Sequence, residues 1–253
     1  MKVTFLGTGT SQGVPVIGCD CHVCRSLDFR DKRLRSSILV ETDGLHLVID
    51  TGPDFRQQML RESVGKLDAV LFTHEHKDHT AGMDDIRSFN FKQKKDMPIY
   101  ARIEVLEQLK REFAYIFAEH KYPGVPQIEA NEIANKPFKV GDINITPIEV
   151  MHYKLPVFGF RIHDFTYITD AKTIAPEEVE KIKGTRVLVI NALQNDPHIS
   201  HMTLDEAIAF AEQIGAEHTY FTHISHKLGK HKHVQASLPQ KMSIAFDGQK
   251  IIL

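Results

Sequence analysis

The sequence predicts an α/β fold, and three observations support this. Short apolar runs, typical of buried strands, alternate along the chain with stretches whose apolar residues recur at helical spacing. Several of these runs end in His or Asp, at the strand ends where α/β proteins place their sites. No low-complexity linker divides the 253 residues, so we expect a single domain over residues 1–253.

Strands are expected in both halves of the chain. In the first half they are residues 3–6, 37–42, 45–49, 67–73 and 98–101, with a hairpin turn at Asp43 and Gly44. In the second half, residues 128–133, 143–151, 157–162 and 166–169 are expected to form a second sheet, followed by strands at 186–190 and 219–223. Residues 243–246 and 249–253 are expected to close the chain as a hairpin over Asp247 and Gly248.

Helices are expected at residues 54–62, 79–89, 103–118, 176–182 and 203–214. The third has the clearest amphipathic pattern, and the last begins with a capping-box signal, Thr203 followed by Glu206. Residues 7–13 form a glycine-rich polar loop that we expect to approach the rim of a site. The basic, His-rich residues 227–233 are expected to be a solvated loop.

The composition is that of an ordinary globular protein, with 42% hydrophobic and 25% charged residues. The net charge of −2 provides no general attraction for nucleic acid or anionic membranes. No apolar run is long enough to span a bilayer, so we expect no membrane association. The first residues read as a strand rather than a signal peptide, so we expect a cytoplasmic protein.

The densest functional signal follows the strand that ends at Thr73. From His74 to His79 the sequence reads H-x-H-x-D-H, with His76 and Asp78 inside the run. In a tight loop after a strand these side chains can converge, and clustered His and Asp residues are typical of metal or catalytic sites. The simpler alternative is a solvated loop that is His-rich by chance.

Residues far along the chain argue against that alternative. His152 and Asp170 each end a strand-like run in the second half, and His223 ends another. A lone His or Asp at a strand end is usually structural, but all three occupy the position that the first motif also occupies. Asp50 ends a strand too, where it either satisfies turn amides or orients a metal-bound histidine.

Together these residues supply enough ligands for two divalent ions. His74, His76 and His152 would bind one ion, Asp78, His79 and His223 a second, and Asp170 can bridge both. Nitrogen and oxygen ligands without thiolates suit Zn²⁺, Mn²⁺ or iron. Two ions lower the pKa of a shared water from about 15.7 towards about 7, which provides a hydroxide nucleophile, and they neutralise phosphate oxygens.

Protonation of a leaving oxygen needs an acid near the ions. His201 lies on an expected loop at the same edge and is the candidate, with His198 on the same loop as the competing choice. A general acid typically contributes about 10²–10⁴-fold to the rate, so its loss should reduce turnover without emptying the metal site.

All three cysteines lie close together, as Cys19, Cys21 and Cys24. They form no disulfide framework and are either free thiols or ligands of one ion. Thiols this close in a loop are typical of a structural Zn²⁺ site with four Cys or His ligands. Because the chain has no fourth cysteine, the fourth ligand must be a His or a carboxylate from elsewhere.

The complete pattern resembles the metallo-β-lactamase superfamily. The H-x-H-x-D-H run with downstream His152, Asp170 and His223 is similar to that superfamily's dinuclear ligand set, over nearly the whole chain. The resemblance implies an αββα sandwich, with two mixed β-sheets packed face to face, helices outside and the metals at one edge. The opening from Phe5 to Pro15, followed by the three cysteines, looks like the PhnP-type phosphodiesterases.

This closer resemblance implies a function and several assignments. PhnP-type enzymes cleave 5-phosphoribosyl 1,2-cyclic phosphate and are similar to tRNase Z, so a phosphodiesterase with two active-site ions, Zn or Mn, is implied. A structural Zn is implied at the three cysteines and His226, which lies three residues after the last active-site ligand. The resemblance favours His201 over His198 as the acid, and we count the ligand Asp78 as catalytic too. A homodimer is expected from the resemblance alone.

Three other functions compete with a small-phosphodiester hydrolase. A tRNase Z-like endoribonuclease would need an RNA-gripping arm, and no basic Gly/Pro-rich insertion is visible; with a net charge of −2 we expect no nucleic-acid partner. A non-hydrolytic relative similar to the PQQ biosynthesis B protein would share the Cys-rich site, but the complete ligand set speaks against it. A thioesterase or lactonase stays open, because a metal-bound hydroxide attacks acyl carbon equally well.

Overall fold

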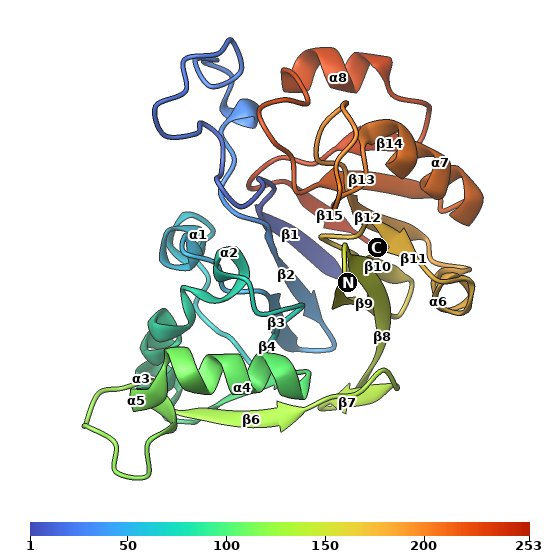
Figure 1. The fold of residues 1–253 in the computed structure, drawn as a ribbon. Coiled ribbons are helices and arrows are strands. Elements are labelled where there is room, and N and C mark those ends of the chain that lie inside the picture. The colour runs from blue at the N-terminus through green and yellow to red at the C-terminus, as the bar shows by residue number, and fades with distance from the viewer.

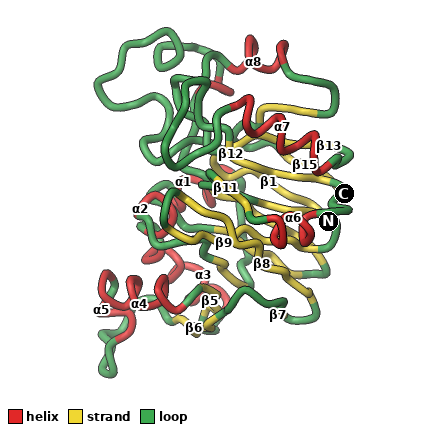
Figure 2. Tube along the Cα trace, turned by 45° about the vertical axis from the view of Figure 1, so that its right-hand side comes forward, coloured by secondary structure: helices red, strands yellow, loops and turns green.

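Two β-sheets pack face to face, and helices cover the outer side of each (Figures 1 and 2). The computed structural model describes residues 1–253. Both sheets contain parallel and antiparallel neighbours. The architecture therefore confirms the αββα sandwich of two mixed sheets.

The first sheet has seven strands in the order β15-β1-β2-β3-β4-β5-β6. They are β1 (Lys2–Gly7), β2 (Ser37–Thr42), β3 (Leu45–Ile49), β4 (Ala69–Leu71), β5 (Met97–Ala101), β6 (Ile128–Glu132) and β15 (Lys250–Ile252). The second sheet has the order β11-β8-β9-β10-β12-β13-β14, with β7 paired to β8. Its strands are β7 (Phe138–Val140), β8 (Ile143–His152), β9 (Leu155–Ile162), β10 (Phe165–Tyr167), β11 (Thr173–Ile174), β12 (Val187–Asn191), β13 (His218–Thr222) and β14 (Met242–Ile244).

The helices are α1 (Phe55–Arg61), α2 (Lys77–Thr80), α3 (Arg87–Gln93), α4 (Ile103–Glu112), α5 (Ala114–Phe117), α6 (Pro176–Ile182), α7 (Leu204–Ile214) and α8 (His231–Ser237), with 3-10 turns η1 (Phe29–Asp31) and η2 (Met83–Ile86). The predicted capping box at α7 is confirmed, since the Thr203 hydroxyl accepts the N–H of Glu206 and the Glu206 carboxylate accepts the N–H of Thr203. None of the helices combines the length and the apolar character needed to cross a bilayer.

The alternation of side chains along each strand produces three apolar layers. In β2, Ile38 and Val40 face the layer between the sheets, whereas Leu39 faces the helices outside. In β8, Ile145 faces the central layer and Ile148 the outer helices. Because the central layer takes side chains from both sheets, the two halves of the chain are held to each other by a shared core.

Two predicted helices are interrupted. The helix expected at residues 79–89 is divided into α2, η2 and α3, because the chain turns tightly at Gly82. A Cβ on Gly82 would lie 2.2 Å from the carbonyl oxygen of Gly52. The helix expected at 103–118 breaks at Phe113 (φ −115°, ψ 44°), and this break lets both Phe113 and Ile116 pack into the layer outside the first sheet.

Two predicted strand placements are wrong. Strand β6 lies in the first sheet rather than the second, because α4 and α5 form the crossover that lets it pair in parallel with β5. The C-terminal hairpin does not form, since β14 pairs with β13 and β15 pairs with β1. Between them, Asp247 accepts the backbone N–H groups of Thr8 and Leu34, at 2.9 and 2.7 Å, instead of closing its own turn.

The stretch at residues 227–233 is not a solvated loop throughout. Helix α8 begins at His231, which is buried beside Phe246 and whose backbone N–H donates to Asp31 Oδ1 at 2.7 Å. Burial, together with the nearby Arg33, lowers the pKa of His231 to about 4. This histidine therefore joins α8 to the N-terminal segment that follows the cysteines.

Candidate metal centres

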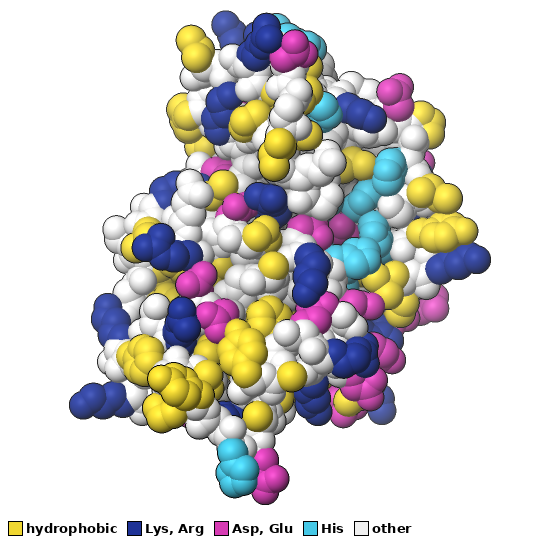
Figure 3. All heavy atoms as spheres, turned by 60° about the vertical axis from the view of Figure 1, so that its left-hand side comes forward, with side chains coloured by type: hydrophobic (Ala, Val, Ile, Leu, Met, Phe, Trp, Pro, Cys, Tyr) yellow, Lys and Arg dark blue, Asp and Glu magenta, His cyan; other side chains and the backbone are white.

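The predicted ligands meet where strands of both sheets end. The motif residues follow β4, His152 ends β8, Asp170 follows β10 and His223 follows β13. Strands β4, β10 and β13 each pair in parallel with a neighbour, so their carboxyl ends lie at one edge of the sandwich. On the face shown in Figure 3, histidine side chains gather beside acidic ones towards the right-hand edge.

Asp50 holds the loop that contains His74 to His79 in place by hydrogen bonds. One carboxylate oxygen accepts the backbone N–H of Thr73 and the other its hydroxyl, both at 2.8 Å. The second oxygen also lies 2.7 Å from His79 Nδ1. Asp50 turns the chain after β3 with φ 65°, and Gly52 then packs so closely on α2 that a Cβ would lie 2.2 Å from the carbonyl oxygen of Asp78. With Nδ1 donating to Asp50, His79 presents Nε2 to the other ligands.

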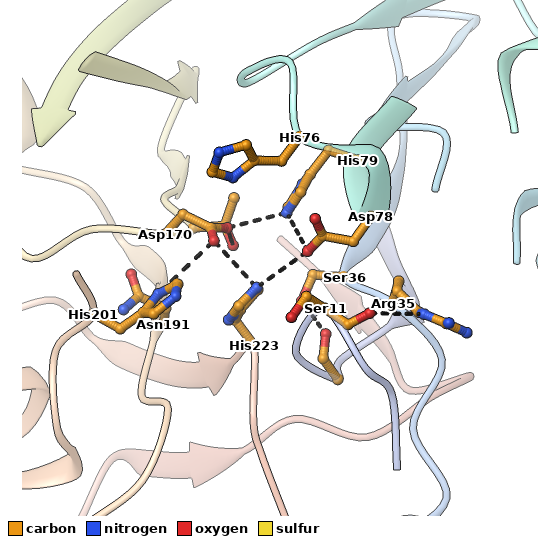
Figure 4. Close-up of polar contacts among 12 residues, drawn as sticks. Ser11, Arg35, Ser36, His76, Asp78, His79, Asp170, Asn191, His201 and His223 are labelled. Atoms are coloured by element: carbon orange, nitrogen blue, oxygen red, sulfur yellow. Dashed lines mark hydrogen bonds and ion pairs between the residues drawn. The ribbon is translucent and has the colours of Figure 1, made fainter. Parts of the chain in front are cut away.

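Asp170 lies at the centre of the cluster (Figure 4). Its Oδ2 is 3.2 Å from His79 Nε2, and its Oδ1 is 3.2 Å from His223 Nε2. Asp78 Oδ2 lies 3.2 Å from His79 Nε2 and 3.8 Å from His223 Nε2. The structure thus brings together Asp78, His79 and His223, the set expected for one ion, with Asp170 facing it. The hydroxyl of Thr169 donates to Asp170 Oδ2 at 2.6 Å and holds the carboxylate.

The set expected for the other ion is less compact. His74 Nε2 lies 3.0 Å from His76 Nδ1, and the His152 ring centroid lies 5.2 Å from that of His76. His152 Nδ1 donates to the carbonyl oxygen of Ser200 at 3.0 Å, which leaves Nε2 free. By the distances between ligand atoms, His74 groups with His79 and Asp170, whereas His152 groups with Asp170 and His201. All seven predicted ligands therefore surround one site. Of the two expected triads, the structure reproduces Asp78, His79 and His223, but not His74, His76 and His152.

The side chains at this site fit divalent cations. Nε2 of His79 and of His223 and Nδ1 of His201 are buried and have no hydrogen-bond partner. Buried polar atoms nearly always have partners, so unpaired imidazole nitrogens that face carboxylates fit a site for a cation. A set of nitrogen and oxygen donors without sulfur suits Zn²⁺, Mn²⁺ or iron.

The histidines and carboxylates of the cluster shift one another's pKa values. Burial lowers the pKa of His79, but the carboxylates of Asp170, Asp78 and Asp50 together outweigh it and raise that pKa well above its usual range. Burial raises the pKa of Asp170, but His223 and His79 outweigh it and hold that pKa well below its usual range. The carboxylates of Asp170 and Asp78 are therefore ionised at neutral pH, which is the form that binds cations, and a bound cation would replace the proton that these carboxylates favour on His79.

The structure places His201 nearer to the cluster than His198. The ring centroid of His201 lies 4.5 Å from that of His152 and 4.8 Å from that of His223. His198 is 5.1 Å from His201, and its Nδ1 accepts the backbone N–H of Ser200 at 3.3 Å. Burial, together with the charge of His223, lowers the pKa of His201 to about 3.

The second predicted centre also converges. His226 Nδ1 lies 3.3 Å from Cys19 Sγ, 3.4 Å from Cys21 Sγ and 3.5 Å from Cys24 Sγ. Three sulfurs and one imidazole nitrogen at one point fit the four ligands of a structural zinc ion. The backbone N–H of Cys24 lowers the pKa of Cys21 to about 6, which favours the thiolate that binds metal.

A short segment connects the two centres. Ile224, between His223 and His226, donates its N–H to Thr8 O at 2.9 Å and accepts the N–H of Thr10 at 3.1 Å. The glycine-rich loop therefore reaches the segment between the two centres, in agreement with the prediction, and the carbonyl oxygen of Ser11 accepts Arg35 Nε–H at 3.1 Å (Figure 4).

Sequence reasoning missed two residues of the site, Thr169 and Asn191. Thr169 is the last residue of the strand expected at residues 166–169 and immediately precedes Asp170. Asn191 ends β12, directly after the strand expected at residues 186–190. A polar residue at a strand end is the signal that indicates His152 and Asp170, and Asn191 carries the same signal.

Comparison with known proteins supports the predicted family. A family model described as a beta-lactamase superfamily domain matches residues 46–224. A solved structure described as a diphosphatase from the PhnP family is 39% identical, covers 100% of this chain and 97% of that chain, and has a TM-score of 0.93. The Zn²⁺-bound PqqB of Methylobacterium extorquens, 21% identical with a TM-score of 0.83 over 100% of both chains, shows a shared fold.

One relative carries a different name. A protein of Porphyromonas gingivalis named octanoyltransferase is 41% identical over 256 residues, which is 100% of this chain but 52% of that protein. The chain thus spans about half the length of this relative, and an acyl-transfer name disagrees with the phosphate chemistry of the PhnP-family structure. Family membership does not depend on that disagreement, because it rests on the family model and on the full-length structural match. The chain belongs to the metallo-β-lactamase superfamily and, within it, to the PhnP family.

Proposed function

We propose that this chain is a metal-dependent hydrolase that cleaves a small cyclic phosphodiester such as 5-phosphoribosyl 1,2-cyclic phosphate. The observation that carries the proposal is the convergence of five histidines and two aspartates around one site, centred on Asp170. The full-length similarity to a PhnP-family diphosphatase supports phosphate as the reacting group.

The seven side chains would hold two divalent cations, Zn²⁺ or Mn²⁺, which supply an activated water and neutralise the oxygens of a phosphate. Neighbouring groups of the protein orient the side chains that would bind these cations. Asp50 fixes the ring of His79, Thr169 fixes the carboxylate of Asp170, and the Ser200 carbonyl fixes the ring of His152. Asp78, which lies beside His79 and His223, supplies a second carboxylate to the site.

His201 is the group that would protonate the leaving oxygen. Its ring lies between those of His152 and His223, and its Nδ1 is 3.8 Å from Asp170 Oδ1. Because burial and His223 lower the pKa of His201, the ring is neutral at pH 7 in the free protein. The negative charge of a bound phosphate would favour the protonated ring, so the acid would form when substrate binds.

A second candidate function is hydrolysis of a diphosphate bridge. It is favoured by the PhnP-family neighbour, which is described as a diphosphatase. Both reactions place a phosphate against the same ligands, and they differ in the leaving group, which is a sugar oxygen in one case and a second phosphate in the other. A direct comparison of rates distinguishes the two substrates.

The test is a substrate panel with the purified protein loaded with Zn²⁺ or Mn²⁺. It compares 5-phosphoribosyl 1,2-cyclic phosphate, a 2′,3′-cyclic nucleotide, bis(p-nitrophenyl) phosphate, a diphosphate-bridged dinucleotide, a pre-tRNA and an octanoyl thioester. We expect the highest kcat/KM for a small cyclic phosphodiester and no hydrolysis by Asp170→Ala. A preference for the dinucleotide selects the second candidate, and a preference for the pre-tRNA or the thioester contradicts both.

A further inference from the structure

Asn191 makes a reciprocal pair of hydrogen bonds with a neighbouring loop. Its side chain is fully buried; its Oδ1 accepts the backbone N–H of Ala171 at 2.7 Å, and its Nδ2 donates to the carbonyl oxygen of Ala171 at 2.9 Å. The backbone ladder between β10 and β12 ends just before this point, where Ile168 donates to Val189 O at 2.8 Å. The carboxamide therefore continues the pairing where the backbones separate.

This pairing holds the turn that carries Asp170. Asp170 has φ 58°, a left-handed conformation that residues other than glycine adopt rarely and that the surroundings must maintain. Thr169 holds its carboxylate on one side, and Asn191 holds both backbone groups of the next residue, Ala171, on the other. The position of the central carboxylate thus depends on Asn191.

The same carbonyl oxygen is connected to His201. Ala171 O also accepts the N–H of Met202 at 2.9 Å, and Met202 O accepts the N–H of Leu193 at 3.1 Å. Because His201 immediately precedes Met202, its loop is attached to the residue that Asn191 clamps. In Figure 4 both Asn191 and His201 are drawn on one side of Asp170, and His201 Nδ1 lies 3.8 Å from Asp170 Oδ1.

Strand β13 adds a third connection. Asn191 pairs with Thr222 in the parallel ladder between β12 and β13, and the N–H of Ala192 donates to Thr222 O at 2.9 Å. Thr222 immediately precedes His223. One buried residue therefore lies at the junction of the segments that carry Asp170, His201 and His223.

We propose that Asn191 is a positioning residue whose carboxamide sets the distance of Asp170 from His201 and His223, and thereby the affinity of the site for divalent cations. The inference rests on the proposed function, because it takes these side chains to be cation ligands. Asn191 itself does not face the cations, since both polar atoms of its side chain are used by Ala171.

Asn90 provides a matched control. It is also buried, at 7% exposure, and its carboxamide makes the same reciprocal pair with the backbone of Gln127, at 3.0 and 2.8 Å. A further bond from its Nδ2 reaches Lys95 O at 2.9 Å. Asn90 lies in α3, outside the first sheet, and its side chain touches no segment that carries a predicted ligand. Replacing it by alanine removes at least as many hydrogen bonds as Asn191→Ala.

The experiment measures Zn²⁺ affinity by competition with a chromophoric chelator, metals per chain by elemental analysis, and Tm, in Asn191→Ala and Asn90→Ala. We expect both substitutions to lower Tm, and only Asn191→Ala to weaken Zn²⁺ binding at the His/Asp site, by about 10–100-fold. The ion at the cysteines should be retained in both. Asn191→Asp, which keeps the acceptor for Ala171 N–H but loses the donor, should weaken Zn²⁺ binding as well and serves if the alanine variant does not fold.

Wild-type Zn²⁺ affinity in the folded Asn191 variant, or an equal loss of affinity in Asn90→Ala, overturns the inference. A wild-type protein that binds no Zn²⁺ at the His/Asp site contradicts the proposed function, and the inference falls with it. The two failures are distinguishable because the first requires a wild-type site that binds metal.

Discussion

At the scale of single residues, the carboxylates of the site are ionised, whereas the ring of His201 is neutral. Asp170 and Asp78 keep their negative charge because His79 and His223 face them. His201 is pushed to its neutral form because it is buried beside the same imidazoles, and burial lowers its pKa to about 3. Whether His201 can act as an acid therefore depends on the charge of the ligand that binds next to it.

The first prediction concerns that role. His201→Ala should lower kcat for a phosphodiester by about 10²–10⁴-fold, the usual contribution of a general acid. Metals per chain, measured by elemental analysis, should stay at the wild-type value, because the predicted ligands remain. His198→Ala is the matched control and should retain most of the turnover. If His201→Ala instead loses an ion, His201 is a ligand, as its grouping with His152 and Asp170 permits.

At the scale of elements, helix α8 shows how a segment without a sequence signal becomes part of the core. Its first residue, His231, lies under Phe246 and beside Arg33, whose guanidinium donates to Thr8 Oγ1 at 2.7 Å and to Ala245 O at 2.6 Å. The helix thus supports the segment between the cysteines and β2. A protonated His231 would place a second positive charge against buried Arg33.

The second prediction follows from this contact. The pKa of His231 is about 4 in the folded protein, below the value of about 6.5 expected in the unfolded chain. Between these values the unfolded chain binds more protons, so this contribution to stability is complete above pH of about 6.5 and is lost as the pH falls towards 4. The free energy of unfolding, measured by urea titration, should fall less between pH 7 and pH 5 in His231→Gln than in the wild type.

His233 is the control for that measurement, because it lies in the same helix but is exposed. The substitution His233→Gln should leave the pH dependence of unfolding unchanged. An identical pH dependence in the wild type and in His231→Gln would show that His231 is not the titrating group.

At the scale of the whole molecule, the candidate metal site joins the two halves of the sandwich. His74 to His79 come from the first half, after β4, whereas His152, Asp170 and His223 come from the second. The central apolar layer joins the same two halves away from the site. Cations bound between them should therefore stabilise the fold as a whole rather than one loop.

The third prediction tests this connection. Zn²⁺ at about 100 times its dissociation constant should stabilise the folded protein by up to about 2.7 kcal/mol for each site, the value for an ion that does not bind the unfolded chain. Thermal unfolding with and without Zn²⁺ measures the effect. Asp170→Ala should lose the part that comes from the His/Asp site, whereas Cys21→Ser should lose the part that comes from the cysteines. Equal Zn²⁺ effects in the wild type and both variants would contradict the two-centre arrangement.

Much of the fold and of the candidate site could be predicted from local sequence. Strands such as β2 and β3 carry their own apolar runs and turn signal, and the run from His74 to His79 carries its own ligand pattern. The breaks at Gly82 and Phe113 could not be predicted, because they depend on close packing against distant backbone or core. The same is true of β6 and β15, whose partners are chosen by sheet order rather than by local sequence.

The sequence by itself determined which residues are candidates for the chemistry, because ligand types and strand-end positions are local properties. Only the tertiary structure decided how those residues are held. It placed Asp50 under His79, brought His226 to the three cysteines, moved His201 nearer to the cluster than His198, and put Asn191 behind Asp170. Each of these contacts joins residues far apart in the chain, and only the packing of the two sheets brings them within hydrogen-bonding or ligand distance.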